Sequence, residues 1–114
     1  MPASRAKPPF VPTTDALQAM IFLDDEDRFG GSAVHEYLLR YLLHEGVAGA
    51  TLFSATMGFG AGHHLQRPRR FGGTDQAPLV LVYVDTEAVV RRTLEHVREV
   101  VGAGKVVLTR AEWC

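Results

Sequence analysis

The chain has 114 residues, 46% of them hydrophobic and 22% charged, which is the composition of one globular domain with its own core. Its formal net charge of −1 excludes the basic surface typical of nucleic-acid-binding proteins, and its single cysteine, Cys114, excludes a disulfide framework within one chain. No apolar run approaches the roughly 20 residues that cross a bilayer. We therefore predict a cytoplasmic protein with no nucleic-acid partner and no membrane insertion.

The N-terminal segment, residues 1–14, holds four prolines and two basic side chains without a continuous apolar stretch, so it is not a secretory signal. We predict a disordered tail there and one domain over residues 15–114. The first strand is predicted over residues 16–23, which end in an apolar run. The acidic residues 24–27 then end the strand, and we expect them to be solvated.

A helix is predicted over residues 32–45, with Ser32 as its N-cap and Gly46 just past its C-terminus. Its apolar face combines the side chains at helical spacing, which are Val34, Tyr37, Leu38, Tyr41 and Leu42. Residues 47–57 are rich in strand-forming and small side chains and predict the second strand.

Residues 58–78 form a polar segment rich in glycine and arginine, without helix or strand periodicity. A loop of roughly 20 residues in a small domain is usually functional or disordered. Its arginines, Arg67, Arg69 and Arg70, suit an acidic partner surface or a phosphate group, with plain solubility as the alternative. His63 and His64 are the potential metal ligands, but adjacent side chains rarely complete a site, so we predict no metal.

The second half repeats the pattern of the first. An apolar strand is predicted over residues 79–84, and a helix follows to residue 101, capped by Asp85 or Thr86. Arg91 and Glu95 have the spacing of an ion pair along that helix. The last strand covers residues 105–111.

Three histidines lie on the two predicted helices, namely His35, His44 and His96. His35 and His44 are nine positions apart, which places them on different sides of one helix. We predict that all three are solvated. Trp113 is expected to pack at a subunit edge.

The order β-α-β, long loop, β-α-β predicts an α+β ferredoxin-like sandwich, with a four-stranded antiparallel sheet and two helices on one face. The other face of the sheet then stays uncovered. Because the strands are apolar along most of their length, we expect a second subunit to cover that face.

Two glycine-rich turns are the strongest functional signal. They are Gly58-Phe59-Gly60 after the second strand and Gly102-Ala103-Gly104-Lys105 before the last one. Glycines let backbone N–H groups approach a ligand closely, and a nearby lysine suits a phosphate. The turns therefore favour a phosphate-bearing ligand, with a helix C-cap and a simple bend as the structural alternatives.

The motifs Gly46-Val47-Ala48-Gly49-Ala50-Thr51 and Gly58-Phe59-Gly60 together resemble the PII-like family catalogued as domain of unknown function 190, over residues 16–112. The wider PII superfamily has the same element order and assembles as trimers. Its long T-loop matches residues 58–78 here, and its nucleotide-binding B-loop matches residues 102–105. The resemblance implies nucleotide contacts, in a cleft between subunits, from Gly58, Gly60, Gly102, Gly104, Lys105 and Arg110.

The resemblance also has departures. PII proteins carry a glutamine that helps to bind Mg-ATP and 2-oxoglutarate where this chain has Gly62, and residues 58–78 lack the tyrosine that some of them modify. We therefore expect a non-enzymatic, trimeric signalling protein without a required cofactor. Its effector would be an adenine nucleotide, or a different small anion, rather than 2-oxoglutarate, and residues 58–78 would act on a membrane transporter or an enzyme.

Two alternatives stay open at this point. One is a metal-binding trimeric module of similar fold, in which His63 and His64 would be the ligands. The other is a small enzyme of unknown reaction. Acylphosphatase shares the predicted fold, but it needs a catalytic asparagine, and this chain contains no asparagine.

Overall fold

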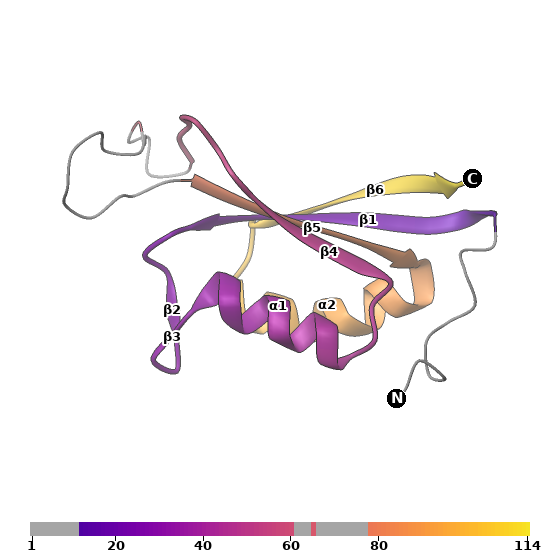
Figure 1. The fold of residues 1–114 in the computed structure, drawn as a ribbon, viewed down its shortest axis with the longest axis horizontal. Helices are drawn as coiled ribbons and strands as arrows, with labels where there is room; N and C mark the ends of the chain where they lie inside the picture. The colour runs from indigo at the N-terminus through magenta and orange to yellow at the C-terminus, as the bar shows by residue number, and fades with distance from the viewer. Residues whose placement is uncertain (1–11, 61–64, 66–77) are drawn as a thin grey trace.

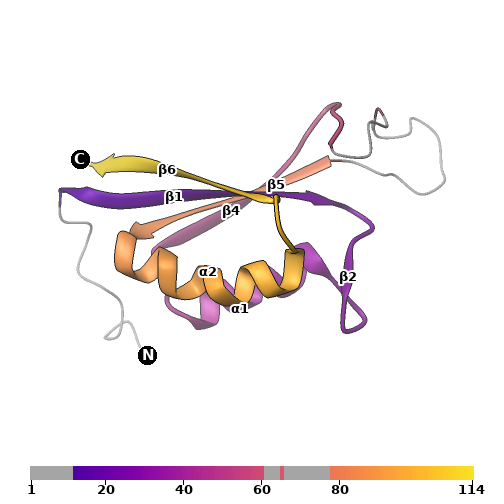
Figure 2. The same cartoon turned by 180° about the vertical axis from the view of Figure 1, so that it is seen from behind.

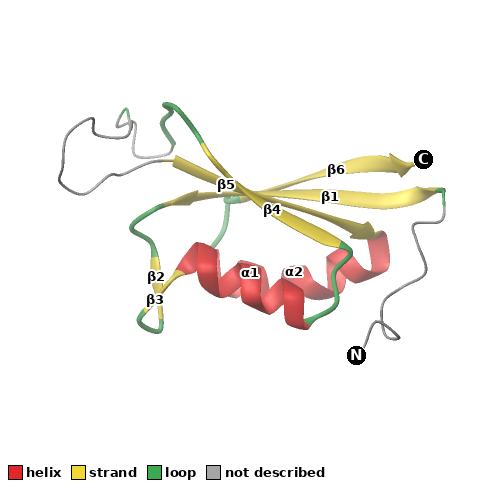
Figure 3. Ribbon diagram, viewed as in Figure 1, coloured by secondary structure: helices red, strands yellow, loops and turns green. Residues whose placement is uncertain are grey.

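The computed structural model describes residues 12–60, 65 and 78–114, and its strands form one sheet with two helices on one face (Figures 1 and 3). The elements in chain order are β1 (Thr13–Asp24), β2 (Arg28–Phe29), β3 (Ser32–Ala33), α1 (Val34–His44), β4 (Gly49–Ser54), β5 (Pro78–Thr86), α2 (Glu87–Val101) and β6 (Val106–Trp113). This arrangement confirms the predicted ferredoxin-like sandwich. The strand β1 begins at Thr13, slightly before the predicted start of the domain.

The sheet has the strand order β4-β5-β1-β6, and every neighbouring pair is antiparallel. The long strand β1 lies in the middle, where Leu17 pairs with Asp85 on one side and with Arg110 on the other. Both edges, β4 and β6, are short strands that follow a helix. The two β-α-β halves therefore interlock, with β5 and β1 at the centre.

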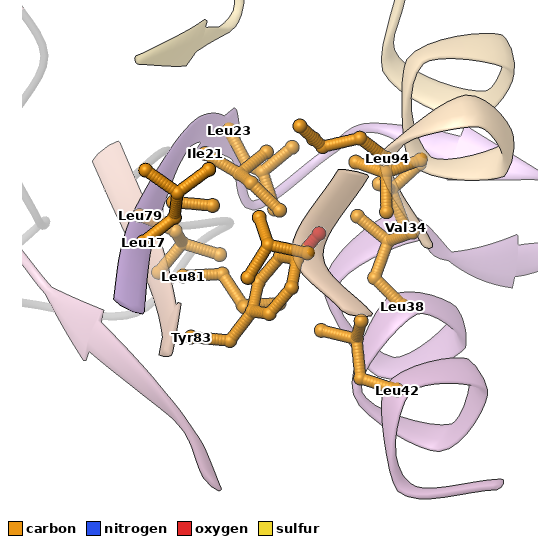
Figure 4. Close-up of a cluster of buried hydrophobic side chains, with 13 residues drawn as sticks. Leu17, Ile21, Leu23, Val34, Leu38, Leu42, Leu79, Leu81, Tyr83 and Leu94 are labelled. Atoms are coloured by element: carbon orange, nitrogen blue, oxygen red, sulfur yellow. The ribbon is translucent and has the colours of Figure 1, made fainter. Parts of the chain in front are cut away.

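The hydrophobic core lies between the sheet and the two helices (Figure 4). Alternate residues of β1 and β5 point to the helices, as the two-residue period of a strand requires. Leu38, Leu42 and Val97 are fully buried on the facing helix sides. Each such side chain contributes roughly 1.5–3 kcal/mol through burial of its apolar surface. The helical spacing predicted from the sequence therefore identified the correct core face.

One polar group is accommodated inside this core. The hydroxyl of Tyr83 lies 3.0 Å from Oγ1 of Thr93, whose hydroxyl also approaches the carbonyl groups of Val89 and Val90. Burial raises the pKa of the Tyr83 phenol, while the hydrogen bond with Thr93 acts in the opposite direction. The phenol therefore stays neutral and hydrogen-bonded in a largely apolar interior.

The start of α1 differs from the prediction. Ser32 is not the N-cap, because it belongs to a small hairpin in which Phe29 pairs with Ser32 and Arg28 with Ala33. The turn of this hairpin is Gly30-Gly31, with both glycines at positive φ. The backbone therefore stays extended through Ala33, which is the N-cap but makes no side-chain capping bond. The helix begins at Val34, two residues later than predicted.

Two further details also differ. The strand β4 covers only Gly49–Ser54, less than the predicted residues 47–57. Arg91 pairs with Glu87, its Nε lying 2.8 Å from Glu87 Oε2, instead of with Glu95. Glu87 lies one helical turn before Arg91, which is the more favourable orientation for such a pair. Of the two predicted caps of α2, Asp85 and Thr86, the structure has Thr86, whose hydroxyl accepts a hydrogen bond from the N–H of Val89.

Asp85 is a fully buried carboxylate at the end of β5. Its Oδ2 accepts a 2.9 Å hydrogen bond from the backbone N–H of Ala48, and its Oδ1 a 2.6 Å bond from the N–H of Thr86. The first of these fixes the connection between α1 and β4, while the second lies at the start of α2. A buried carboxylate needs such partners to offset its loss of hydration.

We predict that Asp85→Ala lowers the free energy of unfolding by about 3 kcal/mol, because the Ala48 and Thr86 N–H groups lose a charged acceptor. Urea denaturation measures the change. Glu112→Ala, which removes an exposed carboxylate from β6, is the control and should stay within about 0.5 kcal/mol of the parent protein. An equally small change for Asp85→Ala would contradict this role.

Candidate functional site

Both glycine-rich turns lie at the same end of the sheet (Figures 1 and 2). The register shows why: Leu79, at the start of β5, pairs with Leu23 near the end of β1 and with Ser54 at the end of β4. Ile21 pairs with Val106, the first residue of β6. The β4–β5 connection and the α2–β6 turn therefore both lie at the end of the sheet where β1 ends, which we call the loop end.

Within one chain, however, the two turns stand on opposite edges. Gly58 and Gly60 follow β4, whereas Gly102 and Gly104 precede β6, and the strands β5 and β1 lie between these edges. Three strand spacings of about 4.8 Å place the two edges roughly 14 Å apart. A single copy of the chain therefore presents two halves of a site and does not bring them together.

The glycine at position 102 is required by the backbone. Gly102 is the C-cap of α2, with φ 84° and ψ 178°, a conformation that is essentially restricted to glycine. Its N–H donates to the carbonyl of Arg98 at 2.9 Å. The C-cap interpretation is therefore correct for Gly102, and its N–H serves the helix rather than a ligand.

The rest of this turn offers free donors. The carbonyl of Lys105 accepts a 2.9 Å bond from the N–H of Phe22, which attaches the turn to the end of β1. The N–H groups of Ala103, Gly104 and Lys105 and the Lys105 ammonium make no hydrogen bond to any group in the described part of the chain. Backbone N–H groups and an ammonium group together suit an anion.

The helix itself works against an anion here, because the C-terminus of a helix carries a partial negative charge of about −0.5. Arg98 in the last turn of α2 and Lys105 beyond it are the nearby cations on these elements. Their positive charge offsets the negative end of the helix dipole. An anion at this turn would therefore depend on Lys105 more strongly than an anion at a helix N-terminus would.

Gly58 and Gly60 have no comparable backbone requirement. Neither has a φ in the left-handed region; a Cβ on Gly58 would lie 3.6 Å from Pro78 Cγ, an ordinary contact, and one on Gly60 would meet open space. The described part of the chain thus has room for a methyl group at both positions. Phe59 between them is 67% exposed. The absence of side chains there favours close approach by something outside the chain.

Arg110 lies away from the loop end in its own chain. It is four residues into β6, roughly 13 Å from the turn, and its guanidinium holds Glu87 with Nη1–Oε1 and Nη2–Oε2 distances of 2.7 and 3.4 Å. The hydrogen bond from Arg110, followed by that from Arg91, lowers the pKa of Glu87. The same contact raises the pKa of Arg110. Its expected contact with a neighbouring subunit's ligand stays a prediction.

Several predicted residues lie outside the described part of the chain. They are Gly62, His63, His64, Arg67, Arg69 and Arg70. Among residues 12–60, 65 and 78–114, no three histidine, cysteine, aspartate or glutamate side chains are grouped as a metal site would require. Within the same residues, no helix is long and apolar enough to cross a membrane.

The prediction that the helix histidines are solvated was wrong for His96, and Nδ1 of His35 is also buried, without a hydrogen-bond partner among the described residues. The ring of His96 lies 4.7 Å from that of Tyr41, and its Nε2 lies 2.6 Å from the hydroxyl of Tyr37. Burial raises the pKa of Tyr41, and the nearby Glu45 carboxylate acts in the same direction. The signal was present in the i, i+4 spacing of the two tyrosines, but the sequence does not show which face of α2 meets them.

The face of the sheet opposite the helices is apolar along its middle. The register aligns Phe53, Val80 and Phe22 in one row across the strands, and Val82, Met20 and Val107 lie in the next. Phe53 and Val107 are about half exposed, and Phe22 is 43% exposed. These rows of exposed apolar side chains agree with the prediction that one face of the sheet is apolar and is not covered by its own chain.

Residues 16–113 match the model of the DUF190 family, described as Uncharacterized ACR. The UPF0166 protein of Aquifex aeolicus is 30% identical over 78 residues, which cover 68% of this chain and 74% of that protein. The UPF0166 protein of Methanocaldococcus jannaschii is 27% identical over 90 residues, which cover 78% of this chain and 82% of that protein.

Among solved structures, the fold is similar to that of CPII from Thiomonas intermedia K12, described as a nitrogen regulatory PII-like protein bound to ADP, AMP and bicarbonate. The TM-score is 0.59, and the match covers 86% of this chain and 85% of that one. The sequence identity is 19%, so the similarity establishes a shared fold.

We predict that Gly102→Ala lowers the free energy of unfolding by about 1–3 kcal/mol, because alanine is strained at this φ and ψ. Chemical denaturation measures this loss. Gly60→Ala is the matched control: its Cβ meets open space without a positive φ, so a change below about 0.5 kcal/mol is expected. Equal effects of the two substitutions would show that the backbone conformation at position 102 does not require glycine.

The Glu87 contacts predict a pH dependence. Because its pKa is lowered from 4.5 in the folded chain, the stabilisation by its arginines is complete above pH 4.5 and is lost as the pH falls through the lowered value. Arg110→Gln should return the Glu87 pKa toward 4.5, as measured by NMR titration of the carboxyl carbon. Arg40→Gln, on the exposed side of α1, should leave it unchanged. If the Glu87 pKa in Arg110→Gln stayed as low as in the parent protein, Arg110 would not be the cause of the lowered pKa.

Proposed function

The chain belongs to the DUF190 family, and from this premise we propose that it is a PII-like regulatory protein that binds an adenine nucleotide between subunits of a homotrimer. Residues 58–78 would transmit the bound state to a partner. The observation that carries the proposal is the position of the two glycine turns. They lie at the same end of the sheet but on opposite edges, so a neighbouring copy is needed to bring them together.

The open face of the sheet supports the self-association. Its exposed apolar side chains, Phe22, Phe53 and Val107 among them, lie on neighbouring strands rather than scattered over the surface. Burying such a face against identical faces removes it from water, which is the main driving force for association. Three copies follow from the resemblance to the PII superfamily, in which this order of elements forms trimers.

The edges of the sheet support a head-to-tail arrangement. Residues 46–62, which include the edge strand β4, contain no ionisable side chain. Edge strands that remain in water usually carry charges or prolines that prevent pairing with another chain. An edge without such protection favours a neighbouring copy at β4, and a cyclic arrangement would place Gly58 and Gly60 of one copy toward Gly102–Lys105 of the next.

The proposed ligand class rests on the donors of the second turn. The N–H groups of Gly104 and Lys105 and the Lys105 ammonium recognise a phosphate group by direct hydrogen bonds and charge. The structurally similar CPII is described with ADP and AMP bound, which supports an adenine nucleotide here. These groups hold an anion without activating it, so we propose a regulatory, non-enzymatic role that requires no cofactor.

Residues 58–78 are the proposed output. They join β4 to β5 directly beside one half of the site, so a ligand at Gly58 and Gly60 would contact the base of this segment. Arg67, Arg69 and Arg70 give it the charge to meet an acidic surface on a membrane transporter or an enzyme. A ligand acts on such a segment only if it binds two of its states with different affinities.

Thermal melting and calorimetric titration with AMP, ADP and ATP test the proposal. A nucleotide at 100 times its Kd should stabilise the folded protein by about 2.7 kcal/mol. Lys105→Ala should weaken binding at least tenfold, since it removes a charged contact of roughly 1.5–3 kcal/mol. Lys105→Arg, which keeps the charge, should bind more tightly than Lys105→Ala.

The proposal fails if none of the three nucleotides shifts the melting temperature, or if Lys105→Ala binds as tightly as the parent protein. A shift by a divalent metal alone, abolished when His63 and His64 are both replaced, would instead favour the metal-binding alternative.

A further inference from the structure

A hydrogen-bonded chain of side chains connects the two helices. The Tyr37 hydroxyl lies 2.6 Å from Nε2 of His96, and Nδ1 of His96 lies 3.1 Å from Oε1 of Glu99. A carboxylate only accepts hydrogen bonds, so Nδ1 of His96 donates to Glu99, and in the matching neutral tautomer Nε2 accepts from the Tyr37 hydroxyl. Each polar atom of the imidazole therefore has a partner of the correct kind.

Aromatic contacts extend this chain to the β2–β3 hairpin. The ring of Phe29 lies 4.8 Å from that of Tyr37 and 6.5 Å, edge-on, from that of His96. Aromatic pairs at such distances stabilise beyond their buried area. The Phe29 side chain is 37% exposed, and its hairpin is a two-residue ladder that would be marginal alone, so these ring contacts are its link to the helices. We call Phe29, Tyr37, His96 and Glu99 the helix tie.

The helix tie lies close to the candidate turn along the chain. His96 precedes Gly102 by six residues, and Glu99 belongs to the last turn of α2. The hairpin leads directly into α1, and the N–H of Val34 donates to the carbonyl of Asp27 at 2.9 Å. The tie thus connects the hairpin that follows β1 with α2, the helix whose C-cap is Gly102.

Without the tie, the end of α2 would be held more weakly. Helix termini are the parts of a helix that open most readily, and Val100 and Val101 are only partly buried. The Gly102–Arg98 bond forms only while this last turn is helical. A contact that fixes α2 against α1 one to two turns earlier therefore also stabilises the conformation of residues 102–105.

We propose that Tyr37 and His96 are positioning residues, whose hydrogen bond holds the hairpin and the end of α2 in one arrangement and thereby fixes the geometry of the Gly102–Lys105 turn. The effect of this bond on the turn is inferred from the contacts above. Any effect on nucleotide binding rests on the proposed function. Tyr41 provides a matched comparison, because its ring also contacts that of His96 but its hydroxyl makes no hydrogen bond to it.

Hydrogen exchange by NMR on the full-length chain, without ligand, tests the tie through three backbone N–H groups. Those of Val34 and Gly102 report on the hairpin and on the turn, and that of Ala48, bound by Asp85, reports on a distant connection. Tyr37→Phe should speed exchange at Val34 and Gly102 roughly threefold to tenfold, the factor expected for one lost hydrogen bond, and leave Ala48 unchanged. Tyr41→Phe should change none of them.

Three results would overturn the proposal: unchanged exchange at Gly102 in Tyr37→Phe, the same increase in Tyr41→Phe, or an equal increase at Ala48. If Tyr37→Phe does not fold, His96→Ala removes the acceptor instead and is judged by the same three N–H groups. If both fold, the double variant should exchange no faster at Gly102 than the faster single variant, because both act on one contact.

A second arm adds ADP. In the parent protein, ADP should slow exchange at Gly102 and, through the tie, at Val34, whereas in Tyr37→Phe the effect at Val34 should be lost. An effect at Val34 that persists in Tyr37→Phe would contradict the proposal. No effect of ADP on the parent protein would count against the proposed function alone, and the ligand-free comparison would still decide on the tie.

Discussion

The structure depends on a sheet that its own chain covers on one face only. Two helices bury the inner face, where Leu17, Ile21 and Leu81 are almost inaccessible to water, whereas the outer face presents Phe22 and Phe53. A small domain cannot cover both faces of a four-stranded sheet with two helices. In the proposed assembly, other copies of the chain bury the remaining apolar area, which links the fold to its self-association.

The same one-sided sheet determines where a ligand would bind in the proposed assembly. Because β4 and β6 are the two edges, the turns that flank them are separated by two strands within a chain and become neighbours only across an interface. The turn at Gly102 also stands at the negative end of a helix dipole, so the proposed anion binding would have to come from free N–H groups and from Lys105.

The helices, the strands and the sides of them that face the core could be predicted from the sequence. Burial of one side of an element leaves apolar residues at a period of 2 in a strand and 3.6 in a helix. Ser32 was misassigned as a cap because the pairing of Phe29 with Ser32 keeps that residue extended, and such a short ladder has no periodicity. His96 was misassigned because its partners are on another helix, and the relative rotation of two helices is a tertiary property.

The most direct test of the account is a crystal structure of the protein grown with ADP. The account predicts three copies around a threefold axis with their open sheet faces buried. Phosphate oxygens should lie within hydrogen-bond distance of the N–H groups of Gly104 and Lys105, with Gly58 and Gly60 of a neighbouring copy beside the same nucleotide. Separate copies with exposed sheet faces, or ADP bound away from both turns, would contradict it.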